Sequence, residues 1–277
     1  MTRLRLFILA AVLALLPPAA LAQFDHTHAA WDALLKKHVK LIDGGKSSQV
    51  RYADLAKERA ALKAYLAQVS GATEAQFGGW SKAEQMAFLI NAYNAYTVEL
   101  ILAKYPDLKS IRDLGNIVFN SPWKRKFFTL FGRESFLDDL EHGMLRKPGV
   151  YDEPRVHYAV NCASVGCPML REEAYVAPRL DAQLEEQARR FLADRTRNRY
   201  NAQSGKLEVS AIFKWFKEDW TSGYRGIGNA GPVTSREQYF ARYADLLADR
   251  PEHRKLVADG KAPIDHLDYD WSLNDAR

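Results

Sequence analysis

One long apolar helix is the feature that most constrains the fold of this chain. A capping box, S-K-A-E at residues 81–84, opens a helix predicted over residues 81–105, and Pro106 follows its end. The side chains of this segment are apolar on almost every face. Such a helix has to be covered on all sides by other elements of its domain. A hydrophobic content of 47% supplies enough apolar side chains for that cover.

Helices and short strands are predicted on both sides of the central helix. Hydrophobic periodicity and turn residues place helices at 25–42, 54–69, 137–146, 178–195, 210–220, 236–248 and 251–259, and strands or hairpins at 49–52, 126–136, 155–161, 200–209 and 264–273. No internal repeat or Pro/Ser-rich linker divides the chain. We therefore predict an α+β fold: a mainly helical single domain over residues 23–277, with a small antiparallel sheet and a buried central helix.

Residues 1–22 have the organisation of a secretory signal peptide. Two arginines precede an unbroken apolar run, Leu6–Leu16, and an A-x-A cleavage signal follows at residues 20–22. The run is too short to span a bilayer, which takes about 20 residues. We therefore expect a periplasmic or secreted protein that has no membrane anchor after cleavage.

The distribution of charge argues against a nucleic-acid partner. The chain has 39 Lys and Arg against 34 Asp and Glu, a formal net charge of +5, and the two signs are interspersed. No basic stripe with interleaved aromatic residues appears. The glycine-rich segment 223–232 lacks phosphate-loop spacing, and no cofactor is predicted. The expected partner is an unidentified small molecule or peptide ligand.

The chemically active side chains are concentrated in residues 155–170, R-V-H-Y-A-V-N-C-A-S-V-G-C-P-M-L, which hold both cysteines of the chain. If this segment begins as a strand, His157 and Asn161 share one face and Cys162 faces the other way. Cys167 precedes a proline suited to the first position of a helix, so Cys167 is the predicted N-cap. The helix dipole would lower the pKa of the Cys167 thiol, which favours Cys167 over Cys162 as a nucleophile.

Three interpretations of this segment remain open. In the first, Cys162 and Cys167 form a structural disulfide in a non-enzymatic periplasmic binding domain. In the second, which is our working hypothesis, one cysteine is the nucleophile of an acyl hydrolase or transferase, with His157 or His142 as its general base. In the third, the same histidines and cysteines bind a metal ion, although their spacing matches no ligand signature.

Two buried amides on the central helix also require an explanation. Asn91 and Asn94 lie three residues apart on one face of a helix that is otherwise apolar. A buried amide without partners costs about 1–3 kcal/mol, so each must be hydrogen-bonded. They either form a satisfied core network, or they line a ligand pocket and orient a catalytic group.

Acyl transfer needs further groups to orient the base and to bind the substrate. Glu141 or Asp270 could orient a histidine, as could the amides of Asn91 or Asn161, and Arg146 could bind an anion. His142 has an alternative, because it could pair with a carboxylate one helical turn earlier or interact with the end of its own helix.

Five segments of the chain, in this order, resemble the domain-of-unknown-function 547 family. They are N-A-Y-N-A-Y-T-V at 91–98, S-I-R-D-L at 110–114, L-D-D-L-E-H-G-M-L-R at 137–146, the cysteine segment at 155–170 and Y-D-W-S-L-N at 269–274. The resemblance covers about the whole chain after residue 22. It implies a common site built from Asn91, Asn94, Glu141, His142, Arg146, His157, Asn161, Cys162, Cys167 and Pro168. It implies no reaction, because the family is named for its unknown function.

Overall fold

The long helix α5 (Lys82–Leu102) lies at the centre of the computed structural model, which describes residues 23–115, 121–228 and 231–276. The predicted signal peptide, residues 1–22, lies outside the described residues. The predicted capping box is present, since the hydroxyl of Ser81 accepts from the backbone N–H of Glu84 and the Glu84 carboxylate accepts from that of Ser81. Within the described part of the chain, no helix combines the length and the apolar character that crossing a bilayer needs.

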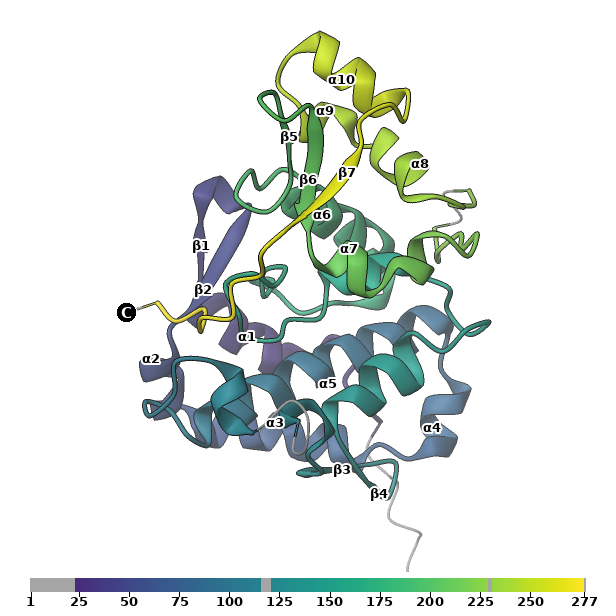
Figure 1. Cartoon of the computed structure of the whole chain (residues 1–277). Coiled ribbons are helices and arrows are strands. Elements are labelled where there is room, and N and C mark those ends of the chain that lie inside the picture. Colours follow the sequence, from purple (N-terminus) through teal and green to yellow (C-terminus); the bar gives the residue numbers. More distant parts are fainter. Residues whose placement is uncertain (1–22, 116–120, 229–230, 277) are drawn as a thin grey trace, which may run out of the picture.

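Helices and a hairpin cover α5 in the lower half of Figure 1. They are α1 (Ala29–His38), α2 (Tyr52–Lys57), α3 (Arg59–Gly71), α4 (Glu74–Gly79), the π-helix η4 (Asp139–Leu145), and the hairpin of β3 (Phe128–Leu130) and β4 (Arg133–Ser135). The first helix is shorter than predicted, because Val39–Ile42 forms strand β1 and pairs with β2 (Ser47–Val50). The mainly helical α+β class is confirmed.

A three-stranded sheet organises the upper half of the molecule (Figure 1). The strands are ordered β5 (Arg199–Asn201), β6 (Lys206–Ser210) and β7 (Ile264–Leu267). Strands β5 and β6 form the predicted antiparallel hairpin, whereas β7 pairs parallel to β6. The surrounding helices share a second hydrophobic core; they are α6 (Leu180–Leu192), α7 (Ile212–Trp215), η7 (Lys217–Trp220), α8 (Arg236–Ala241), α9 (Ala244–Leu247) and α10 (Pro251–Ala258).

The segment before the cysteines differs from the prediction. Residues 155–161 do not form a strand, because Pro154–Tyr158 is a 3₁₀-helix, η5, whose first N–H groups are capped by the Glu153 carboxylate. Every residue from Glu153 to Asn161 is buried, so alternation of side chains along this segment carried no information about faces. Pro168 begins no helix either, and Cys167 is therefore not an N-cap.

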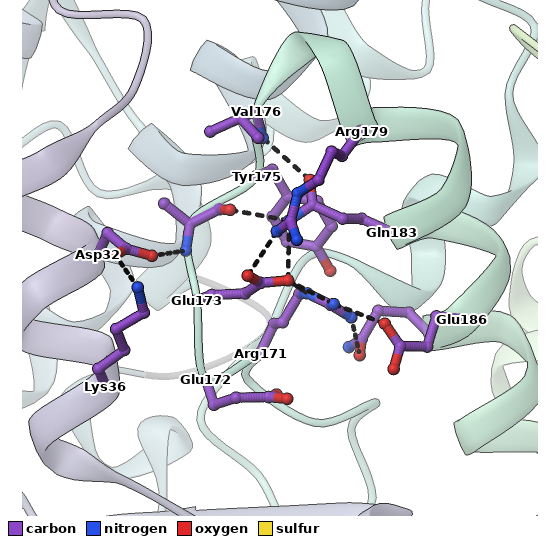
Figure 2. Close-up of polar contacts among 12 residues, drawn as sticks. Asp32, Lys36, Arg171, Glu172, Glu173, Tyr175, Val176, Arg179, Gln183 and Glu186 are labelled. Carbon is purple, nitrogen blue, oxygen red and sulfur yellow. Dashed lines mark hydrogen bonds and ion pairs between the residues drawn. The ribbon is translucent and has the colours of Figure 1, made fainter.

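A polar network anchors the chain that follows the cysteines to helices on both sides (Figure 2). Arg171 is buried and pairs with Glu173 and, at 2.6 Å, with Glu186 of α6. The carboxylate of Asp32 in α1 accepts from the backbone N–H of Ala174 at 3.0 Å. Residues 171–176, which follow the segment of the two cysteines, are thus held between α1 and α6.

Candidate active site

A cavity of about 230 Å³ lies where four parts of the chain meet. They are η4, the loop that follows η5 and holds both cysteines (residues 159–170, the cysteine loop), α7, and the residues that follow β7 (268–276, the C-terminal segment). The structure brings to it all five residues predicted to be catalytic: Glu141, His142, His157, Cys162 and Cys167. Much of the remaining wall is aromatic and comes from Tyr93, Trp123, Trp215, Phe216, Tyr269 and Trp271. A concave site with a few convergent polar groups is the usual form of a small-molecule or active site.

Both cysteines are free thiols, and they differ in environment. The backbone N–H of Cys162 points at Sγ of Cys167, 3.1 Å away, and Cys167 is only 6% exposed. Burial raises the pKa of Cys167 well above its usual range. The pKa of Cys162 is instead lowered, first by a hydrogen bond from Cys167 and then by one from Tyr269, although burial opposes both.

The predicted reason for preferring Cys167, an N-cap position, is wrong. Without a helix after Cys167, no dipole stabilises its thiolate, and its low exposure favours the protonated form. Cys162 has the lowered pKa and is partly exposed, which makes it the better nucleophile of the pair.

The C-terminal segment holds the cysteine loop in place. The backbone N–H of Gly166 donates to Asp270 O, and that of Val165 donates to Ser272 O, both at 2.8 Å. The approach at Gly166 leaves no room for a side chain, because a Cβ there would lie 2.9 Å from the backbone nitrogen of Asp270. The same segment places the hydroxyl of Tyr269 3.2 Å from Sγ of Cys162.

His157 is oriented by a carboxylate that sequence reasoning did not select. Its Nε2 lies 2.6 Å from Oδ2 of Asp219 in η7, and its ring stacks on Phe216. Burial lowers the pKa of His157, and Asp219 opposes this effect only in part. The ring is therefore neutral, and because a carboxylate can only accept, Nε2 carries the proton and Nδ1 is left as a base.

Arg146 completes this arrangement from the other side of Asp219. Its Nε donates to Oδ2 at 2.6 Å and its Nη2 to Oδ1 at 3.1 Å. Burial disfavours the charged carboxylate, yet the hydrogen bonds from His157 and Arg146 outweigh it and hold the pKa of Asp219 at about 2. The guanidinium is thus paired with Asp219, and its role as an anion-binding group stays a prediction.

The second histidine of the cavity lies on the π-helix η4 and is more exposed. Arg146 Nη1 donates to Nδ1 of His142 at 2.7 Å, so the proton of the neutral ring is on Nε2, 3.8 Å from Asp138. Burial and the charge of Arg146 lower the pKa of His142. The predicted pairing with a carboxylate one turn earlier is present only as this long contact.

Glu141 is a buried carboxyl that faces the cavity. Burial raises its pKa, against the opposing charges of His157 and Arg146 and a hydrogen bond from the hydroxyl of Tyr93. Its nearest oxygen is 3.9 Å from His142 Nδ1. Glu141 therefore does not orient either histidine by a short hydrogen bond, and the carboxylate that does so is Asp219.

A comparison with known protein families matches the part of the chain that supplies most of these polar groups. Residues 77–192 match the family model described as "Protein of unknown function, DUF547". The chain contains a DUF547 domain. No curated protein and no solved structure gives a significant match. The matched residues of the DUF547 domain include both cysteines, both histidines of the cavity and Glu141, whereas Asp219 and Tyr269 lie beyond the match.

The three asparagines predicted as binding residues have structural partners in the DUF547 domain. Asn91 exchanges two hydrogen bonds with the backbone of Tyr175, at 2.8 and 3.0 Å. Asn94 donates to Ala159 O at 2.9 Å and accepts from the backbone N–H of Asn161 at 2.8 Å. The interpretation of a satisfied core network is the one that the structure bears out for these two amides.

Asn161 closes the cysteine loop rather than binding a ligand. Its amide nitrogen donates to Pro168 O at 2.8 Å, and its amide oxygen accepts from the backbone N–H of Ala163 at 3.0 Å. Asp270 is exposed, and its carboxylate accepts from the backbone N–H of Ser272, so the prediction that Asp270 orients a histidine is wrong.

Two functional groups were missed for different reasons. Asp219 lies among aromatic residues in the helix predicted at 210–220, and nothing local links it to His157. Tyr269 opens a motif that was recognised, but its neighbour Asp270 was chosen from it.

Within residues 23–115, 121–228 and 231–276, no group of three or more His, Cys, Asp or Glu is placed to hold a metal ion.

Proposed function

We propose that the DUF547 domain carries out thiol-dependent acyl hydrolysis or acyl transfer, with Cys162 as the nucleophile. The observation that carries this proposal is the difference in environment between the two thiols. Cys162 is partly exposed and receives hydrogen bonds that favour its thiolate, whereas Cys167 is buried, which favours its protonated form. A thiolate in a cavity that also contains a carboxylate-oriented imidazole is the arrangement that nucleophilic acyl chemistry requires.

The proposed reaction has two halves. Nδ1 of His157 takes the proton of Cys162, and Asp219 stabilises the imidazolium that results. The thiolate attacks the carbonyl carbon, so that a C–S bond forms and the C=O electron pair moves to the oxygen. Collapse of this intermediate expels the leaving group, which takes the proton from His157. Water or an acceptor alcohol or amine then gives a proton to His157 and attacks the thioester carbonyl carbon. The C–S bond breaks, and His157 returns that proton to the departing Cys162 sulfur.

The dimensions of the cavity support a small acyl group on a larger substrate. About 230 Å³ of space is available beside Cys162. Trp215, Tyr269 and Trp271 also line a second groove of about 450 Å³, bordered by Lys214 and Asp268. We propose that the acyl group enters the cavity and that the rest of the substrate lies along these aromatic rings.

The proposed site of action is the periplasm or the cell exterior, which rests on the signal-peptide pattern at residues 1–22. The rival interpretation is a non-enzymatic binding domain in which Cys162 and Cys167 are joined as a disulfide after export. The two proposals differ in the state of the sulfurs, and counting alkylated thiols with and without prior reduction separates them.

The direct test of the reaction is capture of the acyl-enzyme. The purified protein is mixed with p-nitrophenyl acetate, an acyl donor that needs no knowledge of the natural substrate. We expect a burst of p-nitrophenol and a mass increase of one acetyl group on the peptide that contains Cys162. The Cys162→Ser variant should show neither, whereas Cys167→Ser should retain the burst. Acetylation that is confined to Cys167, or that is equal on surface lysines, would refute the proposal.

A further inference from the structure

The hydroxyl of Tyr269 contacts the sulfur of the proposed nucleophile. Its hydroxyl lies 3.2 Å from Cys162 Sγ, while the Ser164 hydroxyl lies 3.6 Å away. Residue 269 follows strand β7 and is separated from Cys162 by more than a hundred positions, beyond the residues matched to the family. The contact is therefore a product of the tertiary fold.

The ring of Tyr269 is held on several sides, so its hydroxyl cannot easily turn away. It packs against Trp215 and Trp271, with ring centroids 4.9 and 4.5 Å away. The backbone of the next residue is bound by Gly166 of the cysteine loop at 2.8 Å. A donor that is fixed in this way costs no reorganisation when charge develops near it.

The protonation state suits a donor. Burial, together with the nearby thiols of Cys162 and Cys167, raises the pKa of Tyr269 well above its ordinary value of 10.0. The phenol therefore keeps its proton at neutral pH, and beside a thiolate it can only donate.

The backbone groups that usually stabilise an oxyanion are engaged elsewhere. In many acyl-transfer enzymes, the N–H of the nucleophile itself is one of the donors. Here the N–H of Cys162 is directed at Cys167 Sγ at 3.1 Å, and the N–H of Ala163 donates to Asn161 at 3.0 Å. These two N–H groups are therefore not free to stabilise the oxyanion of an intermediate bonded to Cys162, and a nearby side-chain donor could take that role.

We propose that Tyr269 is a catalytic residue of this site, whose hydroxyl donates a hydrogen bond first to Cys162 Sγ and then to the oxyanion. The inference rests on the proposed function. When the C–S bond forms, negative charge leaves sulfur for an oxygen bonded to the adjacent carbon. The phenol follows that charge as a hydrogen-bond donor and transfers no proton, so the proton balance with His157 is unchanged.

The test uses Tyr269→Phe, which keeps the ring, and compares it with the wild type and with Tyr96→Phe. The Tyr96→Phe variant also loses one hydroxyl hydrogen bond, to Ser70 at 2.8 Å, but Tyr96 does not line the cavity. Iodoacetamide labelling of Cys162 is followed by peptide mass spectrometry from pH 5 to pH 10, and the p-nitrophenyl acetate burst is measured on the same samples.

For Tyr269→Phe we expect a labelling midpoint shifted to higher pH and a burst rate lower by roughly 10²–10³-fold, the usual effect of removing one oxyanion donor. Tyr96→Phe should match the wild type in both. A low midpoint in the wild type that is unchanged in Tyr269→Phe, with an unchanged burst, would overturn the inference and leave the proposed function intact. An ordinary thiol midpoint in the wild type would refute the proposed function itself.

If Tyr269→Phe does not fold, 3-fluorotyrosine at position 269 keeps the packing and makes the phenol a stronger donor. The labelling midpoint of Cys162 should then move to lower pH. A midpoint equal to that of the wild type would overturn the inference.

Discussion

The imidazole of His157 and the carboxylate of Asp219 are joined by a 2.6 Å contact between Nε2 and Oδ2, across 62 positions of the chain. The same carboxylate oxygen accepts from Nε of Arg146 at 2.6 Å. These contacts fix the tautomer of His157 and turn its other nitrogen into a base. Asp219 thus has the orienting role that Glu141 or Asp270 was expected to fill.

Replacing Asp219 by Asn should leave the fold intact and reduce the acyl-transfer rate. An amide can donate to Nε2, which would shift the proton of His157 to Nδ1 and remove the base. We expect a decrease of roughly 10²–10⁴-fold in the p-nitrophenyl acetate burst, the range of a general base. Labelling of Cys162 should remain, because its hydrogen bonds come from Cys167 and Tyr269. A burst rate within twofold of the wild type would contradict the role of Asp219.

The stability of the protein should depend on pH through the same carboxylate. The pKa of Asp219 is about 2 in the folded state against an ordinary value of 3.8, so its ionised form stabilises the fold above about pH 4. This contribution is lost as the pH falls from about 4 towards 2. At pH 7, Asp219→Asn should lower the free energy of unfolding by at most about 2 kcal/mol, since partial exposure screens the interaction.

Urea unfolding of the wild type and Asp219→Asn at pH 7, 4 and 2.5 measures this difference. The two curves should approach each other at pH 2.5, which lies just above the folded-state pKa of Asp219. The exposed Asp268→Asn serves as the control and should match the wild type throughout. A difference that persists unchanged at pH 2.5 would show that Asp219 stabilises the fold by some other means.

Asn94→Ala should lower the stability of the fold. Removing the Asn94 amide leaves the buried backbone groups Ala159 O and Asn161 N without their partners. Each unsatisfied group costs about 1–3 kcal/mol, so we expect a loss of roughly 2–4 kcal/mol in urea unfolding. Gln203→Ala, at an exposed position, should change stability by less than about 0.5 kcal/mol. A stable Asn94→Ala protein that had lost only substrate binding would return Asn94 to the binding role.

Gly166→Ala should separate the cysteine loop from the C-terminal segment. The new Cβ would lie 2.9 Å from the backbone nitrogen of Asp270 and 3.1 Å from the ring of Tyr269. We expect a loss of about 1–3 kcal/mol in stability and a higher labelling midpoint for Cys162. Gly78→Ala, in helix α4 with open space around it, should be neutral or slightly stabilising. If the two variants had the same stability and the same labelling midpoint for Cys162, the close contact at Gly166 would not be needed to hold the cysteine loop.

The parts of the fold that could be predicted are those with strong local signals. The capping box and continuous apolar character identified α5, and turn residues identified the hairpins at β3–β4 and β5–β6. The segment over residues 155–161 gave a false strand, because this 3₁₀-helix is buried on every face and its proline and capping glutamate lie just outside the pattern.

The residues that line the site could be predicted from the sequence, but the contacts that orient them could not. Cysteines, histidines and an acidic residue in neighbouring motifs pointed to one cavity, and the structure places all five there. The orientation of each group depends on partners far along the chain, such as Asp219 for His157. In an extended segment, neighbouring side chains point to opposite sides, which is why Tyr269 faces the thiol and Asp270 faces solvent.

The most direct test of the account is the pH dependence of alkylation at each cysteine of the wild-type protein, resolved by peptide mass spectrometry. We expect both thiols to be alkylated without prior reduction. Cys162 should label with a midpoint well below ~8.5, and Cys167 should label slowly at every pH that preserves the fold. Labelling of both cysteines only after reduction, or faster labelling of Cys167, would contradict Cys162 as the nucleophile.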